Sequence, residues 1–360
     1  MVSDHDIARW RLRSQHLDRP TPPGAAAVVT SLLGFQAENP SQSAWAVATR
    51  TTGPDPAGLA RCLADGSVLR VHALRSTWHY VGSDDLVWLQ ELTAPRVRRN
   101  TQHALRSRPG LDDATVGRLG ERVMAALEGG RHLTRSQVSD VLAAAGHELD
   151  RTALMILMAD LELRALVCSG VPAGDHHTYA LVSERVRDPR RPEREEALGE
   201  LVRRYFTGHG PATREDLAYW ATLTLTDVDT GLVVARGGLA SFEHDGRTFW
   251  HAVGEEPPTG PAEPLAHLLQ ILDETYRGYQ DSRWVLDTAG AVPRQREAAI
   301  GMALVDGQLV ASMKRTLSAT RALFELAPYA SWDPAMLVAV ERAAARYGTF
   351  LGLEAVVDVR

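Results

Sequence analysis

One stretch indicates the fold most directly: Leu239-Ala240-Ser241-Phe242-Glu243-His244-Asp245-Gly246-Arg247-Thr248-Phe249-Trp250-His251-Ala252. An Asp-Gly pair between two runs that contain aromatic and β-branched residues is a strong signal for a tight β-hairpin. Two helical patterns precede it, one capped by Thr213-Arg214-Glu215-Asp216 and one from Thr226 to Ala235. Two helices followed by a hairpin are the element order of a winged helix.

The same order of elements occurs twice earlier in the chain. Residues 110–190 carry three helical patterns, one of them opened by the capping box Thr134-Arg135-Ser136-Gln137, and then two strand-like runs between Val167 and Val182. Residues 1–109 carry helical patterns, among them a buried helix predicted from Ala25 to Phe35, and strands between Val68 and Val81. We therefore predict three tandem winged helices, 1–109, 110–190 and 191–258, that repeat every ~80 residues.

The pattern changes after residue 258. Strand-like runs surround Asp306-Gly307, another covers Ala322 to Leu326, and a helix is predicted from Met336 to Tyr347. These features predict a small, mostly β domain at 259–360 with a closing helix, and an α+β fold class overall.

Composition limits the classes of function. The 360 residues have a net charge of −6, and no run of 18 apolar residues or signal peptide is present, which predicts a cytoplasmic protein. Cys62 and Cys168 are isolated, so we expect no disulfide framework, no metal centre and no cofactor. The negative charge disfavours nonspecific coating of nucleic acid, but DNA binding through an arginine-rich face stays open.

Gln36 and Glu38 are the candidate catalytic pair. Pro40 ends the preceding helix, and in an extended segment residues two apart point to the same side, where they could share one water molecule or one sugar. On local chemistry alone a second interpretation competes: Gln36 ends a helix, and Glu38 is a solvated charge before a helix capped by Asn39.

Several segments, taken in order, resemble the AlkZ and YcaQ family of bacterial DNA glycosylases. They are Leu33 to Pro40, Leu74 to Val81, Leu166 to Gly170, Gly210 to Thr213, Leu272 to Tyr276, Val305 to Val310 and Lys314 to Leu317. No single motif carries the resemblance, which covers nearly the whole chain.

The resemblance implies three winged helices around a C-shaped DNA channel and a C-terminal β-barrel whose hairpin reaches the duplex. It also implies catalysis by Gln-x-Gln in the AlkZ type or Gln-x-Asp in the YcaQ type, which map onto Gln36 and Glu38. This chain departs from both patterns because its second position is Glu.

The expected activity is that of a monofunctional DNA glycosylase that excises N7-alkylated guanine, including bulky or crosslinked adducts, with self-resistance to a genotoxic natural product as one setting. Such a base is already cationic and leaves without a general acid. Glu38 would polarise the attacking water and offset the charge of the sugar, while Gln36 orients that water. With Lys314 as the single lysine, a hydrolase is favoured over a β-lyase.

Basic side chains supply the expected contacts to double-stranded DNA. Arg75 and His79 are predicted to share one face of a strand, and the alternative for them is a structural histidine and a surface arginine. The other candidates are Arg96, Arg98, Arg99, Arg294, Arg296, Lys314 and Arg315. Three units in one chain suit a monomer without an obligate protein partner, whereas a winged-helix transcriptional regulator, the alternative function, usually dimerises on a palindromic site.

Overall fold

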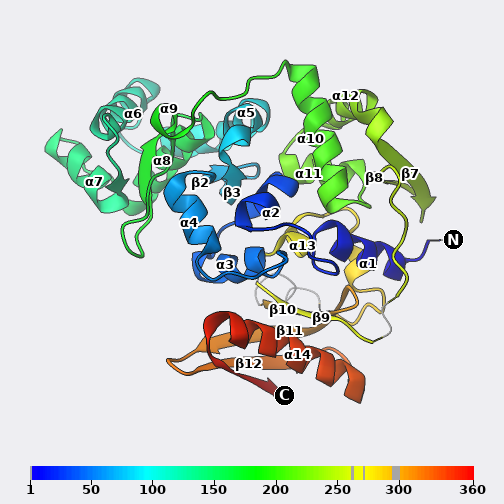
Figure 1. Ribbon diagram of the computed structural model, residues 1–360. Coiled ribbons are helices and arrows are strands. Elements are labelled where there is room, and N and C mark those ends of the chain that lie inside the picture. The colour runs from blue at the N-terminus through cyan, green and yellow to red at the C-terminus, as the bar shows by residue number, and fades with distance from the viewer. Residues whose placement is uncertain (1, 261–262, 271, 294–300) are drawn as a thin grey trace.

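A computed structural model describes residues 2–260, 263–270, 272–293 and 301–360 of the chain. Runs of helices are joined to small, mostly antiparallel sheets, so the predicted α+β class is confirmed (Figure 1). Arg294 and Arg296 lie outside the described residues.

The first part of the chain surrounds a three-stranded antiparallel sheet of order β1-β3-β2. Its elements are α1 (Asp4–Ser14), α2 (Ala25–Ser31), β1 (Phe35–Gln36), α3 (Pro40–Ala48), α4 (Gly58–Asp65), β2 (Val68–Ala73), β3 (Thr77–Gly82) and α5 (Ser83–Arg106).

The helix predicted to reach Phe35 ends earlier, at Ser31. Leu33 takes a left-handed conformation, with φ of 64°, and the chain then turns into β1, where Gln36 lies opposite His79 of β3. Gly34 lies at this turn, and a Cβ added there would be 3.3 Å from Leu74 Cδ1 and 3.5 Å from Trp220 Cζ2. Pairing with β3 therefore overrides the apolar helical pattern, and the first candidate catalytic residue lies in a strand.

The second part also joins helices to a small antiparallel sheet, of order β4-β6-β5. The predicted capping box is confirmed, since the Thr134 side chain accepts from the Gln137 N–H. The elements are α6 (Asp113–Leu127), β4 (Leu133–Thr134), α7 (Arg135–Ala144), α8 (Arg151–Leu163), β5 (Val167–Ser169), β6 (Thr178–Leu181) and α9 (Val182–Arg185).

The third part ends in the hairpin that the sequence predicts. Asp245 and Gly246 have φ of 48° and 68°, the positive values that a two-residue turn with the twist of the strands requires. The elements are α10 (Arg194–His209), α11 (Arg214–Ala221), α12 (Leu225–Ala235), the 3₁₀ turn η1 (Arg236–Gly238), β7 (Leu239–His244) and β8 (Arg247–Ala252).

The last part is a five-stranded sheet of order β13-β12-β11-β10-β9 with α14 packed against it. Where a closed barrel was expected, the described strands form an open sheet with β9 and β13 at its edges. The elements are β9 (Ala266–Leu269), α13 (Glu274–Arg277), the 3₁₀ turn η2 (Arg283–Leu286), β10 (Gly301–Val305), β11 (Gln308–Leu317), β12 (Arg321–Pro328), α14 (Pro334–Leu351) and β13 (Glu354–Val359).

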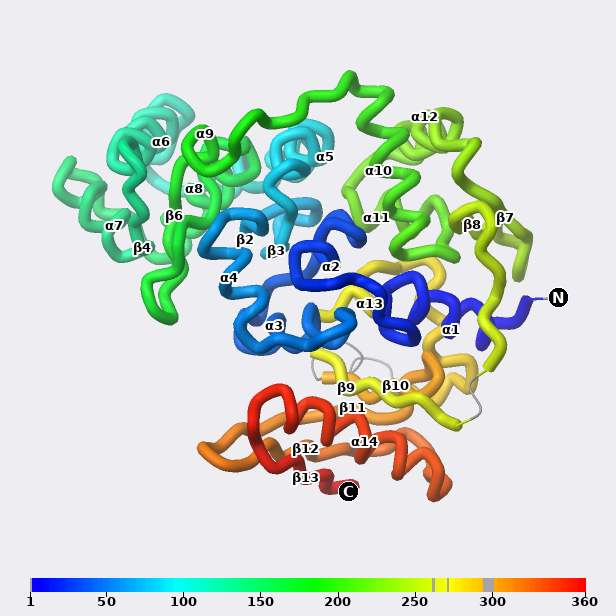
Figure 2. The backbone as a smooth tube through the Cα atoms, in the orientation of Figure 1, coloured from blue at the N-terminus to red at the C-terminus, as the bar shows by residue number. Residues whose placement is uncertain are grey.

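The four parts pack against one another rather than standing apart. The first lies in the middle, α6 to α9 and α10 to α12 flank it, and the C-terminal sheet lies on a third side (Figure 1). One hydrophobic core joins Trp88 of α5 to Leu201 and Trp220 of the third part, and the segment after α9 crosses the molecule to α10 (Figure 2). No helix among the described residues is both long and apolar enough for a membrane span.

Candidate active site

Gln36 is fixed from both sides of β1. The neighbouring Ala37 N–H donates to the Trp78 carbonyl at 2.8 Å, which extends the pairing with β3. The Gln36 N–H points to the opposite side, away from the sheet, and donates to Glu274 Oε1 at 2.9 Å. A two-residue edge strand is therefore held by the sheet on one side and by a carboxylate on the other.

The Gln36 amide is oriented by His79. The carbonyl of Thr77 lies 2.8 Å from His79 Nδ1, so Nδ1 carries the proton and Nε2 is left as an acceptor. Gln36 Nε2, at 3.3 Å, then donates to His79 Nε2 and also lies 3.4 Å from Thr77 Oγ1. Burial, together with the charge of Arg75, lowers the pKa of His79 to about 4, which keeps the ring neutral.

This arrangement leaves Gln36 Oε1 as a buried acceptor with no hydrogen-bond partner among the described residues. A buried polar atom without a partner is costly unless a ligand or water satisfies it. Gln36 Oε1 is therefore suited to accept an O–H bond from a bound water.

Glu38 is partly buried and is held by one of its two oxygens. Oε1 accepts the Trp78 N–H at 2.8 Å, and no hydrogen bond from the described residues occupies the other oxygen. Both side chains contact the same short stretch of β3, since the Gln36 amide lies 3.3 Å from His79 Nε2 and 3.4 Å from Thr77 Oγ1, and Glu38 Oε1 accepts the Trp78 N–H. The motif therefore places two acceptors, one of them anionic, against residues 77–79.

Arg70 of β2 supports this segment. Its Nε donates to the Ala37 carbonyl at 3.1 Å, between the two candidate catalytic residues, and its guanidinium lies 4.0 Å from the centre of the Trp78 ring. Burial lowers the pKa of Arg70, and the nearby carboxylates Glu162 and Glu38 oppose that effect.

Glu274, at the start of α13, is completely buried behind β1. Its Oε2 accepts the Trp220 indole N–H at 3.1 Å and lies 3.4 Å from His209 Nε2. Burial alone would raise its pKa, but the His209 hydrogen bond and the charges of His209 and Arg75 outweigh burial and lower the pKa to about 2. The group is therefore an anion.

Two of the predicted DNA contacts, the buried His79 and the partly buried Arg75, make hydrogen bonds within the molecule. The His79 side chain has no exposed surface, so it orients Gln36 and offers nothing to a phosphate in this conformation. Arg75 donates to the Trp220 carbonyl at 2.7 Å and lies 5.3 Å from the centre of the Tyr219 ring. Arg75 thus joins the first part of the chain to the third.

The three arginines predicted on α5 have different surroundings. Arg96 donates to the Leu223 carbonyl at 3.2 Å, and Arg98 pairs with Asp160 of α8 at 3.0 Å. Arg99 is exposed and makes no hydrogen bond or ion pair with the part of the chain that the structure describes. Arg99 is therefore the member of this group most accessible to a phosphate.

Lys314 and Arg315, adjacent in β11, point to opposite faces of the sheet. The Lys314 side chain is 73% exposed and lies 3.5 Å from Glu325. The Arg315 guanidinium lies 4.3 Å from the centre of the Tyr347 ring on α14. Only Lys314 of this pair is freely accessible.

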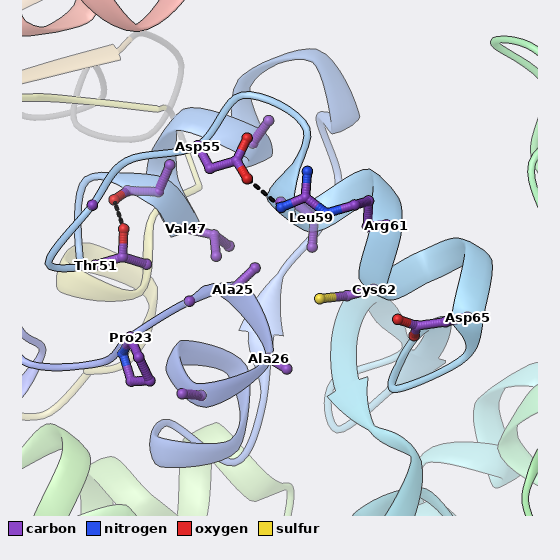
Figure 3. A pocket seen from close by; sticks show the side chains of 16 residues that line it. Pro23, Ala25, Ala26, Val47, Thr51, Asp55, Leu59, Arg61, Cys62 and Asp65 are labelled. Atoms are coloured by element: carbon purple, nitrogen blue, oxygen red, sulfur yellow. Dashed lines mark hydrogen bonds and ion pairs between the residues drawn. The ribbon is translucent and has the colours of Figure 1, made fainter.

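A separate hollow of about 520 Å³ lies among α2, α3 and α4 (Figure 3). Small apolar side chains such as Ala25, Val47 and Leu59 form much of its lining, and Asp55 at its edge pairs with Arg61. Neither Gln36 nor Glu38 lines this hollow. Within the described ranges, no group of three or more His, Cys, Asp or Glu side chains could hold a metal ion.

Sequence reasoning missed Glu274, Arg70, His209 and Trp220 as neighbours of the motif. Glu274 lies in Leu272 to Tyr276, a segment that carries the family resemblance, and this was a usable signal. The contact itself joins residues 238 positions apart, which no local pattern predicts.

Comparisons with known proteins agree with this architecture. The family described as DNA glycosylase AlkZ-like matches residues 29–350. The interstrand DNA cross-link repair glycosylase of Streptomyces sahachiroi is 29% identical over 235 residues, an alignment that spans 62% of each protein. The solved structure of the Streptomyces sahachiroi DNA glycosylase AlkZ has the same fold, with a TM-score of 0.78, 23% identity and 99% of each chain covered.

Proposed function

The chain belongs to the AlkZ-like family of DNA glycosylases, and from this premise we propose that it hydrolyses the N-glycosidic bond of N7-alkylated guanine in duplex DNA. The observation that carries the proposal is that the buried Gln36, whose Oε1 has no hydrogen-bond partner among the described residues, and the Glu38 carboxylate both contact residues 77–79 of β3. Bulky and crosslinked adducts are included in the proposed substrate class, since the relative from Streptomyces sahachiroi is named for cross-link repair.

The chemistry follows from the charges. Alkylation at N7 makes guanine a good leaving group, so the chain has to stabilise a cationic sugar and deliver water to C1′. The free oxygen of Glu38 and Gln36 Oε1 each accept one O–H of that water, and the Glu38 charge offsets the positive charge that develops on the sugar. Water adds to C1′, its proton passes to Glu38, and the bonding electrons leave with the neutral alkylguanine.

Glu at the second motif position is consistent with this mechanism. A carboxylate accepts a proton and offsets positive charge, whereas the Gln of the AlkZ-type motif orients water without either effect. Trp78 N–H holds one carboxylate oxygen at 2.8 Å, so the longer Glu side chain is restrained despite its additional methylene.

The three helix-and-hairpin parts are proposed to act as winged helices that follow the duplex as a monomer. Accessible Arg99 and Lys314 are the proposed phosphate contacts, with the β11–β12 hairpin against the DNA. The likeness in fold to AlkZ supports this arrangement.

The direct test is excision from duplexes that carry either N7-methylguanine or a bulky N7-guanine adduct, followed by alkali to reveal abasic sites. We expect Glu38→Ala and Gln36→Ala to slow single-turnover excision by ~100-fold or more, because each removes a water acceptor. Glu38→Gln should lie between wild type and Glu38→Ala, since it keeps an acceptor and loses the charge.

Asp55→Asn, which changes a carboxylate in the separate hollow, is the matched control and should excise like wild type. Excision by Glu38→Ala at the wild-type rate would refute the assignment. Sequence-specific DNA binding without excision by the wild-type protein would identify a transcriptional regulator instead. Comparison of the two duplexes decides whether bulky adducts are preferred.

A further inference from the structure

The residues packed behind Gln36 come from parts of the chain that are distant in sequence. Glu274 comes from α13, His209 from the end of α10 and Trp220 from α11, while Gln36 lies in β1. The three donors Gln36 N–H, Trp220 Nε1–H and His209 Nε2–H surround a carboxylate with no exposed surface. The hydrogen bond from Gln36 N–H to Glu274 Oε1 joins α13 to the backbone of the motif.

The segment that carries Glu274 packs against α10. Tyr205 OH donates to the Gly278 carbonyl at 2.7 Å, and Tyr279 OH donates to the His209 carbonyl at 2.6 Å. A Cβ added at Gly278 would lie 2.9 Å from His209 Cδ2, so this approach requires glycine. The position of Glu274 is therefore set by packing, and it in turn sets the position of β1.

Using a buried anion to accept the N–H of an edge strand costs more free energy than using a neutral acceptor. A water molecule or a neutral side chain would also accept that hydrogen bond, whereas burial of a charge costs several kcal/mol before its partners compensate. A charged acceptor makes shorter and stronger hydrogen bonds than a neutral one. Such a cost in stability is explained if the reaction depends on the position of β1.

We propose that Glu274 is a positioning residue, whose carboxylate fixes the backbone of Gln36 so that the Gln36 amide faces the reacting water. The inference rests on the proposed function and deepens it, because the site is then complete only when α13 is docked behind β1. Misplacement of a water-orienting group by about 1 Å lowers a rate by roughly 100-fold.

The test compares Glu274→Ala with a control one residue away. Asp273 is also completely buried, forms an ion pair with Arg50 at 2.6 Å and makes no hydrogen bond to β1. Asp273→Asn should lower the melting temperature yet keep the single-turnover rate of the folded protein within about 2-fold of wild type. Glu274→Ala should slow excision by ~100-fold with an unchanged Kd for the duplex.

A double-mutant cycle separates positioning through Gln36 from a general structural role. In a Gln36→Ala background there is no side-chain amide left to position. Adding Glu274→Ala should then slow single-turnover excision by less than about 3-fold. An equal loss in both backgrounds would overturn the proposal. If Glu274→Ala does not fold, Glu274→Gln, which keeps an oxygen for the Gln36 N–H, is used in the same cycle.

Amide hydrogen exchange at Gln36 provides a readout that needs no activity. The Gln36 amide should exchange faster in Glu274→Ala than in Asp273→Asn. Trp220→Phe removes one donor to Glu274 but keeps an aromatic ring, so its exchange rate should lie between those two. Unchanged protection of the Gln36 amide in Glu274→Ala would overturn the inference. A wild-type protein that excises neither adduct would refute the proposed function, while the exchange data would still decide whether Glu274 holds Gln36.

Discussion

Trp78 contacts both the proposed catalytic segment and Arg70, the side chain that supports this segment. Its backbone N–H holds Glu38, its carbonyl accepts the Ala37 N–H, and its ring lies beneath the Arg70 guanidinium. His72, 4.0 Å from Trp78 between ring centres, packs on the same tryptophan and contacts Glu162 of α8. A single residue of β3 therefore connects Glu38 to the second part of the chain.

Arg70→Lys tests whether this support affects the reaction. Lysine keeps the positive charge but has neither the planar stacking surface nor the Nε–H that reaches the Ala37 carbonyl. We expect single-turnover excision to fall by ~10-fold while DNA affinity stays the same. A rate equal to wild type would mean that Ala37 is held well enough by its bond to Trp78.

At the scale of elements, strand alternation decides what each basic residue can do. In β11, Met313 packs in the core with Phe324 and α14, Lys314 points away from that helix, and Arg315 lies against Tyr347. Two adjacent cations thus have different surroundings, one solvated and one packed on an aromatic ring.

Lys314→Ala and Arg315→Ala should therefore have different effects. Lys314→Ala should weaken duplex binding and reduce the slope of log K against log salt by ~1, because a phosphate contact is lost. Arg315→Ala should lower the melting temperature through lost packing on Tyr347 and leave the slope unchanged. Salt titrations of binding for both variants decide this, and a change of slope in Arg315→Ala alone would contradict it.

At the scale of the whole molecule, packing between parts buries neutral histidines. Burial, together with nearby arginines, lowers the pKa of His267 to about 3 and that of His79 to about 4, below the ordinary value of 6.5. His79 lies in β3 of the first part, and His267 lies in β9 of the C-terminal sheet. Both rings stay uncharged in the folded chain at neutral pH.

Stability should therefore fall as the pH falls from about 6.5 toward 4. In that range the unfolded chain takes up protons at these histidines and the folded chain does not, which costs up to about 1.4 kcal/mol per pH unit for each group. Glu274, whose pKa is lowered from 4.5 to about 2, contributes stability that is lost as the pH falls from about 4.5 to 2.

Urea unfolding at pH 7.5, 6 and 5 measures this dependence. As the pH falls, the free energy of unfolding should decline less steeply in His267→Gln than in wild type. The difference in slope should correspond to about one bound proton, since one of the titrating groups is gone. A free energy of unfolding that is constant between pH 6.5 and 5 would contradict the prediction.

The sequence by itself determined the features that depend on near neighbours. Asp245-Gly246 specifies its hairpin because both residues tolerate positive φ, and Thr134 with Gln137 specifies the start of α7 because the two satisfy each other's free backbone groups. The choice of Gln36 and Glu38 as a catalytic pair stays a prediction, made from the alternation of side chains in an extended segment. The ordered family segments added the expected chemistry of that pair.

Tertiary structure alone decided how the pair is held. The end of α2 at Ser31, the burial of His79 and the contact between Glu274 and Gln36 all depend on partners contributed by other parts of the chain. A helical pattern gives way where a neighbouring strand offers better hydrogen bonds. A buried charge or an unsatisfied amide can be assigned a partner only after packing has brought together residues that lie far apart in the sequence.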